Sequence, residues 1–314
     1  MKLVVTIPAY NEEKTIAKVI SEIPKRISGI KEIEVIVIDD GSTDRTKEMA
    51  LSLGAKVYSN KKNFGLAYSF SKGLNLALES GADIIVNTDA DFQYDQKQMI
   101  SLVKPIIDGE ADVVLGSRFL GKIEYMPLQN FVGNIIVSQL VSFLTGTKIT
   151  DSQTGFRAFS KEAAMKIKVY SDYTYTQETI MEAIEKKLVV KEVPVNFRKR
   201  EGKSRLISNI FDYGKKVGLT IIETYINYRP LRTFSLIGFF LIFFGLISGS
   251  KVMIHFINTG EVSPYIPSAI LSSLLLIMGF QAIVLGMVAE IMKRNRKIQE
   301  EILYLAKKNK YSEK

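Results

Sequence analysis

The sequence lacks cysteine and tryptophan altogether and has a single histidine, His255, among its 314 residues. Without cysteine, the chain has no disulfide bonds, no thiolate nucleophile and no thiolate metal site. One histidine cannot build a histidine metal cluster, so a metal site must consist of oxygen ligands, which suit Mg²⁺ or Mn²⁺. A signal-peptide pattern is also missing, because Met1-Lys2 leads directly into the β-branched run Leu3–Ile7.

Two phosphate-binding fingerprints are missing as well. The pattern Gly-x-x-x-x-Gly-Lys-[Ser/Thr] does not occur, because Gly202-Lys203-Ser204 has neither the earlier glycine nor a preceding strand, and no Gly-x-Gly-x-x-Gly is found. These absences argue against a P-loop enzyme and a standard dinucleotide-binding site. The net charge of +9 nevertheless favours anionic partners. We expect phosphorylated substrates and a lipid membrane, and no nucleic acid.

The first 115 residues alternate short apolar runs with segments of helical spacing. Such alternation is typical of βαβ units and predicts a parallel, doubly wound α/β sheet that is covered on both faces. We expect strands at 3–7, 34–38, 56–59, 83–87 and 113–116, helices at 12–27, 43–53, 65–80 and 95–108, and then a helix at 175–187 and a strand at 189–197.

Two long apolar runs, 234–257 and 266–290, follow. Each can cross a hydrocarbon core of about 30 Å, which takes about 20 residues. The link between them contains no lysine or arginine, whereas Arg229 and Arg232 precede the first run and Lys293 and Arg294 follow the second. The positive-inside rule therefore predicts a multi-pass protein of the cell membrane, with the N-terminal domain and both termini cytoplasmic.

Three further segments border these runs. Residues 129–144 could form an amphipathic helix near the membrane. Residues 209–228 predict another, which would either lie in the membrane interface or pack on the N-terminal domain. A charged tail helix suggests self-association, so a homo-oligomer is a possible state. The expected organisation is a domain at 1–206, an interface helix at 207–232, a two-helix transmembrane hairpin at 233–292 and a basic tail helix at 293–314.

Asp89-Ala90-Asp91 directly follows the fourth expected strand. Two carboxylates at the carboxyl end of a strand point into the crevice where open α/β sheets bind ligands. An Asp-x-Asp pair alone is more often an ordinary turn. Its interpretation as a metal site therefore depends on the other clusters of polar residues.

Two of these clusters follow the first and second strands. In the segment 7–13, Tyr10 can stack on a base and Glu12 can accept its N–H groups, although Asn11 could equally be a helix N-cap. In the segment 39–44, Asp40 can accept a hydrogen bond from a base, or the segment can be an ordinary Asx-turn.

A set of cations completes the candidate site: Arg118, Arg157 and the run 198–205. A leaving diphosphate and an acceptor phosphate both need charge-assisted donors, which arginine provides. The basic run could instead bind lipid headgroups.

Together, six motifs in this order resemble family 2 glycosyltransferases with the GT-A (Rossmann-like) fold, over about residues 1–206. Within that family the chain is similar to the dolichyl-phosphate mannose synthase and polyprenyl-phosphate glucosyltransferase branch. The motifs are Ile-Pro-Ala-Tyr-Asn-Glu-Glu at 7–13, Asp-Asp-Gly-Ser-Thr-Asp at 39–44, Asn-Phe-Gly at 63–65, Asp-Ala-Asp-Phe-Gln at 89–93, Gly-Ser-Arg-Phe at 116–119 and Gln-Thr-Gly-Phe-Arg at 153–157.

This resemblance implies a role for each matched position. The residues expected to bind the nucleotide are Pro8, Tyr10, Glu12, Asp39, Asp40, Asp89 and Ala90. Those expected to hold Mg²⁺ or Mn²⁺ are Asp89, Asp91 and Gln93, and those expected to take part in catalysis are Asp91, Arg118 and Gln93. The diphosphate or the acceptor phosphate would be bound by Arg118, Arg157, Arg200 and Arg205.

The implied activity is metal-dependent, inverting transfer of a hexose, glucose or mannose, from a UDP- or GDP-sugar to dolichyl or polyprenyl phosphate. The reaction would take place at the cytoplasmic membrane face, for glycan assembly or protein glycosylation. Asn130 stands where dolichyl-phosphate mannose synthases carry an arginine, which makes mannose a less secure donor sugar. Glu178 lies near the position of an acidic base in processive relatives. The alternatives are a transferase acting on a sugar or polysaccharide and a non-catalytic nucleotide-binding scaffold.

Overall fold

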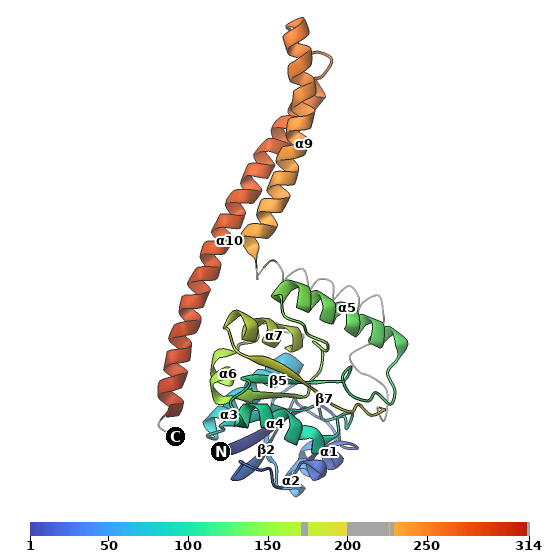
Figure 1. Cartoon of the computed structure of the whole chain (residues 1–314), viewed down its shortest axis with the longest axis vertical. Coiled ribbons are helices and arrows are strands. Elements are labelled where there is room, and N and C mark those ends of the chain that lie inside the picture. Colours follow the sequence, from blue (N-terminus) through green and yellow to red (C-terminus); the bar gives the residue numbers. More distant parts are fainter. Residues whose placement is uncertain (171–174, 200–225, 227–228, 313–314) are drawn as a thin grey trace. The chain divides into compact units, whose positions relative to one another are not determined.

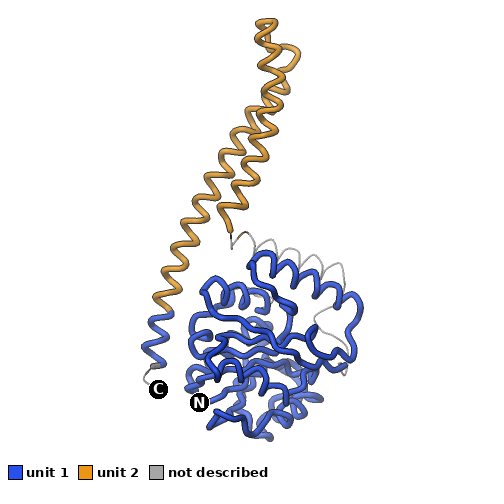
Figure 2. Tube along the Cα trace, viewed as in Figure 1, with its two compact units in different colours: residues 1–203, 304–314 blue, residues 204–303 orange. Residues whose placement is uncertain are grey.

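The computed structural model describes residues 1–170, 175–199, 226 and 229–312. The chain divides into two compact units (Figure 2). One comprises residues 1–203 together with 304–314, and the other comprises residues 204–303. The expected domain boundary at residue 206 and almost all of the predicted interface helix at 207–232 lie outside the described residues, so both stay predictions.

The first unit is built on a sheet with helices around it (Figure 1). The sheet is mixed, and in the described part of the chain it has seven strands in the order β3-β2-β1-β4-β6-β5-β7. The five expected early strands are all present. The strands are β1 (Lys2–Ala9), β2 (Glu32–Asp39), β3 (Lys56–Ser59), β4 (Ile84–Asn87), β5 (Val113–Ser117), β6 (Arg157–Ser160) and β7 (Val190–Pro194).

The strands expected within residues 1–115 all run in the same direction, as predicted, and the sheet also contains one reversed strand that was not expected. β6 runs antiparallel to both of its neighbours, β4 and β5. Because of this reversal, the residues just before β6 lie at the edge where β1, β2, β4 and β5 end. Neither β6 nor the short helix that follows it was expected from the apolar pattern, because four residues are too few to show a period.

Helices cover both faces of this sheet. The helices of the first unit are α1 (Ile16–Glu22), α2 (Thr46–Ser52), α3 (Leu66–Glu79), the 3-10 turn η1 (Gln96–Gln98), α4 (Met99–Ile107), α5 (Leu128–Thr145), α6 (Lys161–Lys166) and α7 (Thr176–Glu185). Buried side chains of α1, α2 and α4 join Leu3, Val5 and Ile7 of β1 in one core cluster.

The helix α3 packs closely on the opposite face of the sheet. A Cβ atom added at Gly73 would lie 3.0 Å from Ile38 and 3.3 Å from Thr6, so a side chain there would push α3 away from β1 and β2. Phe70, a second buried residue of α3, stacks on Tyr175 with ring centroids 3.8 Å apart. β1 is nearly all apolar because both of its faces are covered in this way.

The second unit contains α9 (Pro230–Thr259) and most of α10 (Ile266–Ser312). Both helices are long and apolar enough to cross a membrane, as expected, and they extend beyond the predicted spans of 234–257 and 266–290. The predicted separate tail helix is instead the continuation of α10. Its last residues belong to the first unit, where Lys307 donates to Asn75 and Lys310 to Glu79, each at 3.0 Å.

Candidate active site

The carboxyl ends of four parallel strands place most of the expected site residues along one edge of the sheet. β1 pairs in parallel with β2 and β4, and β5 has the same direction because β6 reverses between them. The residues that this edge brings together are Pro8, Tyr10 and Glu12 from β1 and its loop, Asp39 and Asp40 from β2, Asp89, Ala90, Asp91 and Gln93 after β4, and Arg118 after β5.

The loops after β1 and β2 are tied to each other. Asn11 has φ of +55°, an uncommon conformation for a residue other than glycine. Its Oδ1 accepts from the backbone N–H of Thr43 at 2.8 Å, and its own N–H donates to Ser42 Oγ at 2.9 Å. Asn11 is therefore a link between two loops, and the N-cap residue of α1 is Thr15.

Asp40, expected at the nucleoside, organises the segment that precedes α3. Its carboxylate accepts from the side-chain amide of Asn60 at 2.7 Å and from the backbone N–H groups of Phe64 and Gly65 at 3.0 and 2.8 Å. Asp39 Oδ1 likewise accepts from the Ser42 N–H at 3.0 Å. Both carboxylates therefore shape this end of the site, and direct contact with a base stays a prediction.

The turn that carries Asp91 is held from several sides. Asp91 Oδ1 accepts from the backbone N–H of Gln93 at 3.1 Å, and Phe92 between them has φ of +63°. The guanidinium of Arg198 lies 4.4 Å from the centroid of the Phe92 ring. The backbone N–H of Arg198 donates to the Gln93 carbonyl at 2.7 Å. The segment after β7 thus fixes a strained turn at the position expected for a metal ligand.

A divalent cation fits the donor set at this edge. Within the described residues, no three acidic or histidine side chains converge on one point. The candidate ligands Asp89, Asp91 and Gln93 offer oxygen atoms alone, and a Mg²⁺ ion is commonly held by one or two carboxylates together with substrate phosphates. Gly155 leaves room for the first carboxylate, since a Cβ there would lie 2.5 Å from both Asp89 oxygens.

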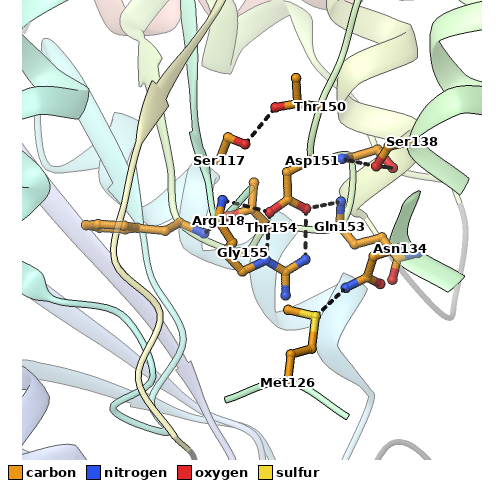
Figure 3. Close-up of polar contacts among 12 residues, drawn as sticks. Ser117, Arg118, Met126, Asn134, Ser138, Thr150, Asp151, Gln153, Thr154 and Gly155 are labelled. Carbon is orange, nitrogen blue, oxygen red and sulfur yellow. Dashed lines mark hydrogen bonds and ion pairs between the residues drawn. The ribbon is translucent and has the colours of Figure 1, made fainter. Parts of the chain in front are cut away.

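Arg118 lies at the same edge in a buried ion pair (Figure 3). Its Nε and Nη2 donate to the two carboxylate oxygens of Asp151 at 2.7 and 2.8 Å, and its backbone N–H also donates to Asp151. Glu192 accepts the backbone N–H groups of Thr150 and Asp151, so the partner carboxylate is itself fixed. Burial acts to lower the pKa of Arg118, but the interactions with Asp151, Tyr94 and Asp89 together outweigh it and the pKa is raised. The site therefore contains an oriented, permanent positive charge.

Arg157, also expected to bind phosphate, is wholly buried. Its guanidinium donates to the carbonyls of Ser152, Thr154 and Thr176 and to the hydroxyl of Thr179. Burial lowers its pKa from the usual value. Arg157 therefore joins the 152–154 segment to α7, and binding a phosphate would require breaking these bonds. Arg200 and Arg205 lie outside the described residues.

The structure adds residues that sequence reasoning missed. Asn87 and Tyr94 flank the carboxylate segment, and Asp151 lies two residues before the Gln-Thr-Gly-Phe-Arg motif. Asp151 is wholly buried, which a sequence window rich in polar residues does not reveal. Its position beside a recognised motif was the one available signal.

Comparison with known proteins agrees with this geometry. The sequence matches the glycosyl transferase family 2 over residues 4–168. A dolichyl-phosphate hexose transferase of Haloferax volcanii is 31% identical over 228 residues, which cover 72% of this chain and 95% of that protein. A UDP-N-acetylglucosamine–dolichyl-phosphate N-acetylglucosaminyltransferase of Methanococcus voltae is 35% identical over 214 residues, or 60% of this chain and 82% of that protein.

Solved structures share the fold. The glucosyl-3-phosphoglycerate synthase of Mycobacterium tuberculosis, crystallised with Mn²⁺, UDP and glucosyl-3-phosphoglycerate, superimposes with a TM-score of 0.55 at 21% identity. The match covers 72% of this chain and 79% of that one. The first unit therefore has the GT-A fold, with apolar C-terminal helices long enough to span a membrane, and the chain belongs to glycosyl transferase family 2.

Proposed function

We propose that this protein is a membrane-bound glycosyltransferase that moves a hexose from a UDP- or GDP-sugar to dolichyl or another polyprenyl phosphate. Relatives named for transfer to dolichyl phosphate, including the two described above, support this acceptor. The apolar helices α9 and α10 support a membrane location. The positive-inside pattern supports a cytoplasmic position for the catalytic unit and for both termini.

The observation that carries the proposal is the two-sided character of α5. Between residues 128 and 145 there is no charged side chain, and Leu128, Ile136 and Phe143 are 76%, 57% and 81% exposed. A large exposed apolar patch on a soluble surface marks an interaction site. In a chain that also has membrane-length helices, a lipid surface is the partner that suits an uncharged helix face.

The inner face of α5 holds the segment that positions Arg118. Ser138 Oγ accepts from the Ser152 N–H at 2.9 Å, and Ser142 Oγ accepts from the Ile149 N–H at 2.9 Å. Between these two anchored residues lies Asp151, the partner of Arg118. The helix α5 thus connects an exposed apolar surface with the segment that fixes Arg118.

In the proposed reaction, an oxygen of the acceptor phosphate attacks the anomeric carbon of the donor sugar. The bond from that carbon to the nucleoside diphosphate breaks, the diphosphate leaves with the electron pair, and the anomeric configuration inverts. A phosphate monoester with a second pKa near 6 is already largely ionised at neutral pH. A strong general base is therefore unnecessary, which suits a described site with no histidine.

Each charged group of the site has a task in this scheme. Asp89 and Asp91, with Gln93 beside them, would hold Mg²⁺ or Mn²⁺, which when bound neutralises negative charge on the diphosphate. Arg118 would stabilise the charge that grows on the leaving diphosphate or on the acceptor phosphate, because a preoriented donor costs no reorganisation. Tyr10 and Glu12 would contact the base, and Asp40 would shape that end of the pocket.

The decisive test is transfer of radiolabelled sugar into lipid. Membranes containing the protein, Mn²⁺ and a polyprenyl phosphate are supplied with UDP- or GDP-hexoses, and organic-extractable label is counted. We expect label from at least one donor, an about 10²–10³-fold loss in Asp91→Asn, and no loss in Asp108→Asn, which changes an exposed carboxylate after α4.

Absence of lipid-linked label with every donor would overturn the proposal. Label appearing instead in a water-soluble oligosaccharide acceptor would favour the alternative of a sugar or polysaccharide acceptor. Full activity in Asp91→Asn would remove the proposed metal site and reopen the possibility of a nucleotide-binding scaffold.

A further inference from the structure

The backbone of Gly155 is clamped by buried side chains at both its N–H and its carbonyl. Its N–H donates to the hydroxyl of Tyr94 at 3.0 Å, and its carbonyl accepts from the Asn87 side-chain amide at 2.9 Å. Asn87 is fully buried, and only 2% of Tyr94 is exposed. Because these hydrogen bonds hold the peptide units on both sides of its Cα, Gly155 has little freedom to rotate or shift.

The two clamping side chains are themselves held. Asn87 Oδ1 accepts from the hydroxyl of Thr6 at 3.2 Å, and its amide also donates to the hydroxyl of Tyr175 at 2.9 Å. The Tyr94 ring lies between Phe156 and Phe197, with both pairs of centroids 5.3 Å apart. Such support fixes the rotamers of both clamping residues.

The clamped peptide lies directly against the carboxylate of Asp89. A Cβ at residue 155 would come within 2.5 Å of both of its oxygens and 2.7 Å of its carboxyl carbon. Only a hydrogen atom on the Gly155 Cα fits against the Asp89 carboxylate.

Sequence and topology explain why these groups meet. Asn87 ends β4 two residues before Asp89, and Tyr94 follows Asp91 by three residues. The segment 87–94 therefore carries all three expected metal ligands and both clamping side chains. β6 is antiparallel to β4, so the residues before β6 return to this same edge and place Gly155 opposite the carboxylates.

We propose that Asn87 and Tyr94 are positioning residues, which hold the Gly155 peptide as a backstop that orients the Asp89 carboxylate toward the divalent cation and the donor diphosphate. This inference rests on the proposed function. It differs from a purely structural role in one respect: loss of the backstop should weaken the metal-dependent part of nucleotide binding and leave the metal-independent part unchanged.

The test measures binding of UDP and GDP by isothermal titration calorimetry, to the full chain in detergent, with Mn²⁺ and again with EDTA. We expect Gly155→Ala to weaken binding at least tenfold with Mn²⁺, because the new methyl group displaces the carboxylate. Tyr94→Phe should weaken it by about threefold to tenfold, since one hydrogen bond to the peptide is lost. Affinities in EDTA should stay within twofold of wild type.

Two control variants make the same kinds of change, loss of a hydroxyl and addition of a methyl group, at positions away from Asp89. Ser80→Ala deletes a hydroxyl that donates to Glu34, at the opposite end of the strands. Gly133→Ala adds a methyl group where no other heavy atom lies within 4 Å. Both should bind Mn²⁺ and nucleotide as wild type does. A raised Mn²⁺ concentration should restore the transfer rate of Tyr94→Phe.

The possible outcomes distinguish failure of the proposed metal site from failure of the backstop. Wild-type binding that is the same with Mn²⁺ and EDTA would overturn both the proposed metal site and the backstop. Mn²⁺-dependent binding in the wild type that Tyr94→Phe and a folded Gly155→Ala retain would overturn the backstop alone. Equal losses with Mn²⁺ and with EDTA would assign these residues a structural role, which also contradicts the inference. If Gly155→Ala does not fold, Tyr94→Phe decides.

Discussion

Two helices of the catalytic unit, α3 and α5, differ in the burial of their large apolar side chains. α3 places Phe70, Leu74 and Leu78 against the sheet and buries all three. α5 buries a narrower inner face that includes Ser138, and exposes large apolar side chains such as Phe143. α3 is thus explained by the core alone, whereas α5 leaves an exposed apolar face that suits a second apolar partner.

The two sides of the segment 149–152 also differ, because one side carries buried charges and the other faces an uncharged helix. On its inner side, Asp151 and Arg118 form a buried pair, in which each charge depends on the other. On its outer side, α5 is free of charge. Substitutions on the inner side should therefore damage folding and chemistry together, and substitutions on the outer side should affect only the encounter with lipid.

The largest effect is expected for Asp151→Asn. This change leaves the buried guanidinium of Arg118 without its counter-charge, which costs about 3 kcal/mol or more of folding free energy. It also frees the arginine from its orientation, and we expect transfer to fall about 100-fold. Thermal unfolding and the transfer assay measure the two losses.

A matched carboxylate elsewhere provides the control for this change. Asp112→Asn alters a carboxylate whose Oδ2 accepts from the Val189 N–H at 2.8 Å, at the other end of β5. It should cost less stability and leave the transfer rate per folded molecule unchanged. Wild-type transfer and stability in Asp151→Asn would show that the pair does not position Arg118.

An intermediate effect is expected on the exposed face of α5. Ile136→Asp or Phe143→Asp places a charge where the proposed lipid surface lies, which costs about 2.5–3.5 kcal/mol at the centre of a bilayer and less near the interface. We expect the KM for a long-chain polyprenyl phosphate to rise about tenfold. The kcat with a short, water-soluble alkyl phosphate should remain unchanged, because the inner face is untouched.

Leu51→Asp on α2 is the control, since that leucine is also half exposed but lies on a different helix. It should change neither the KM for the long-chain acceptor nor the kcat with the short one. If the α5 variants keep the wild-type KM for the long-chain acceptor, the exposed face of α5 has another partner, and the comparison with α3 no longer indicates lipid.

The contrast between the helices also marks what the sequence could predict. Continuous apolar runs in β1 and β4 identified strands covered on both faces, and the polar residues after them lie along one edge of the sheet, as expected. The resemblance correctly identified the family. β6 could not be found in this way, because its four residues Arg157–Ser160 have no period and its direction depends on tertiary pairing.

Side-chain roles were harder to predict than positions. Arg118 and Arg157 look equivalent in the sequence, each being an arginine after a glycine-containing motif. The structure gives one of them a carboxylate partner at the site edge and surrounds the other with backbone carbonyls in the interior. Burial and partner depend on how β6 returns to the edge, which local sequence does not encode.

The smallest effect is expected at the end of the strands away from the site, where Glu34 accepts from Lys2, Lys56 and Ser80. Burial acts to raise the pKa of Glu34, but these three hydrogen bonds outweigh it and lower the pKa to about 2. Because the folded pKa is below the unfolded value, the stabilisation is complete above about pH 5 and is lost as the pH falls toward 2.

Glu34→Gln should therefore lower stability by about 1 kcal/mol at pH 7, since solvent screens a pair that includes the exposed Lys56. The difference from wild type should shrink between pH 5 and pH 3, when it is followed by thermal unfolding in detergent. Glu32→Gln, at a more exposed carboxylate that also pairs with Lys2, should show a smaller difference. Transfer activity should stay unchanged in both variants, because neither residue lies at the carboxyl edge. A difference for Glu34→Gln that is constant from pH 7 to pH 3 would mean that its charge contributes nothing to folding.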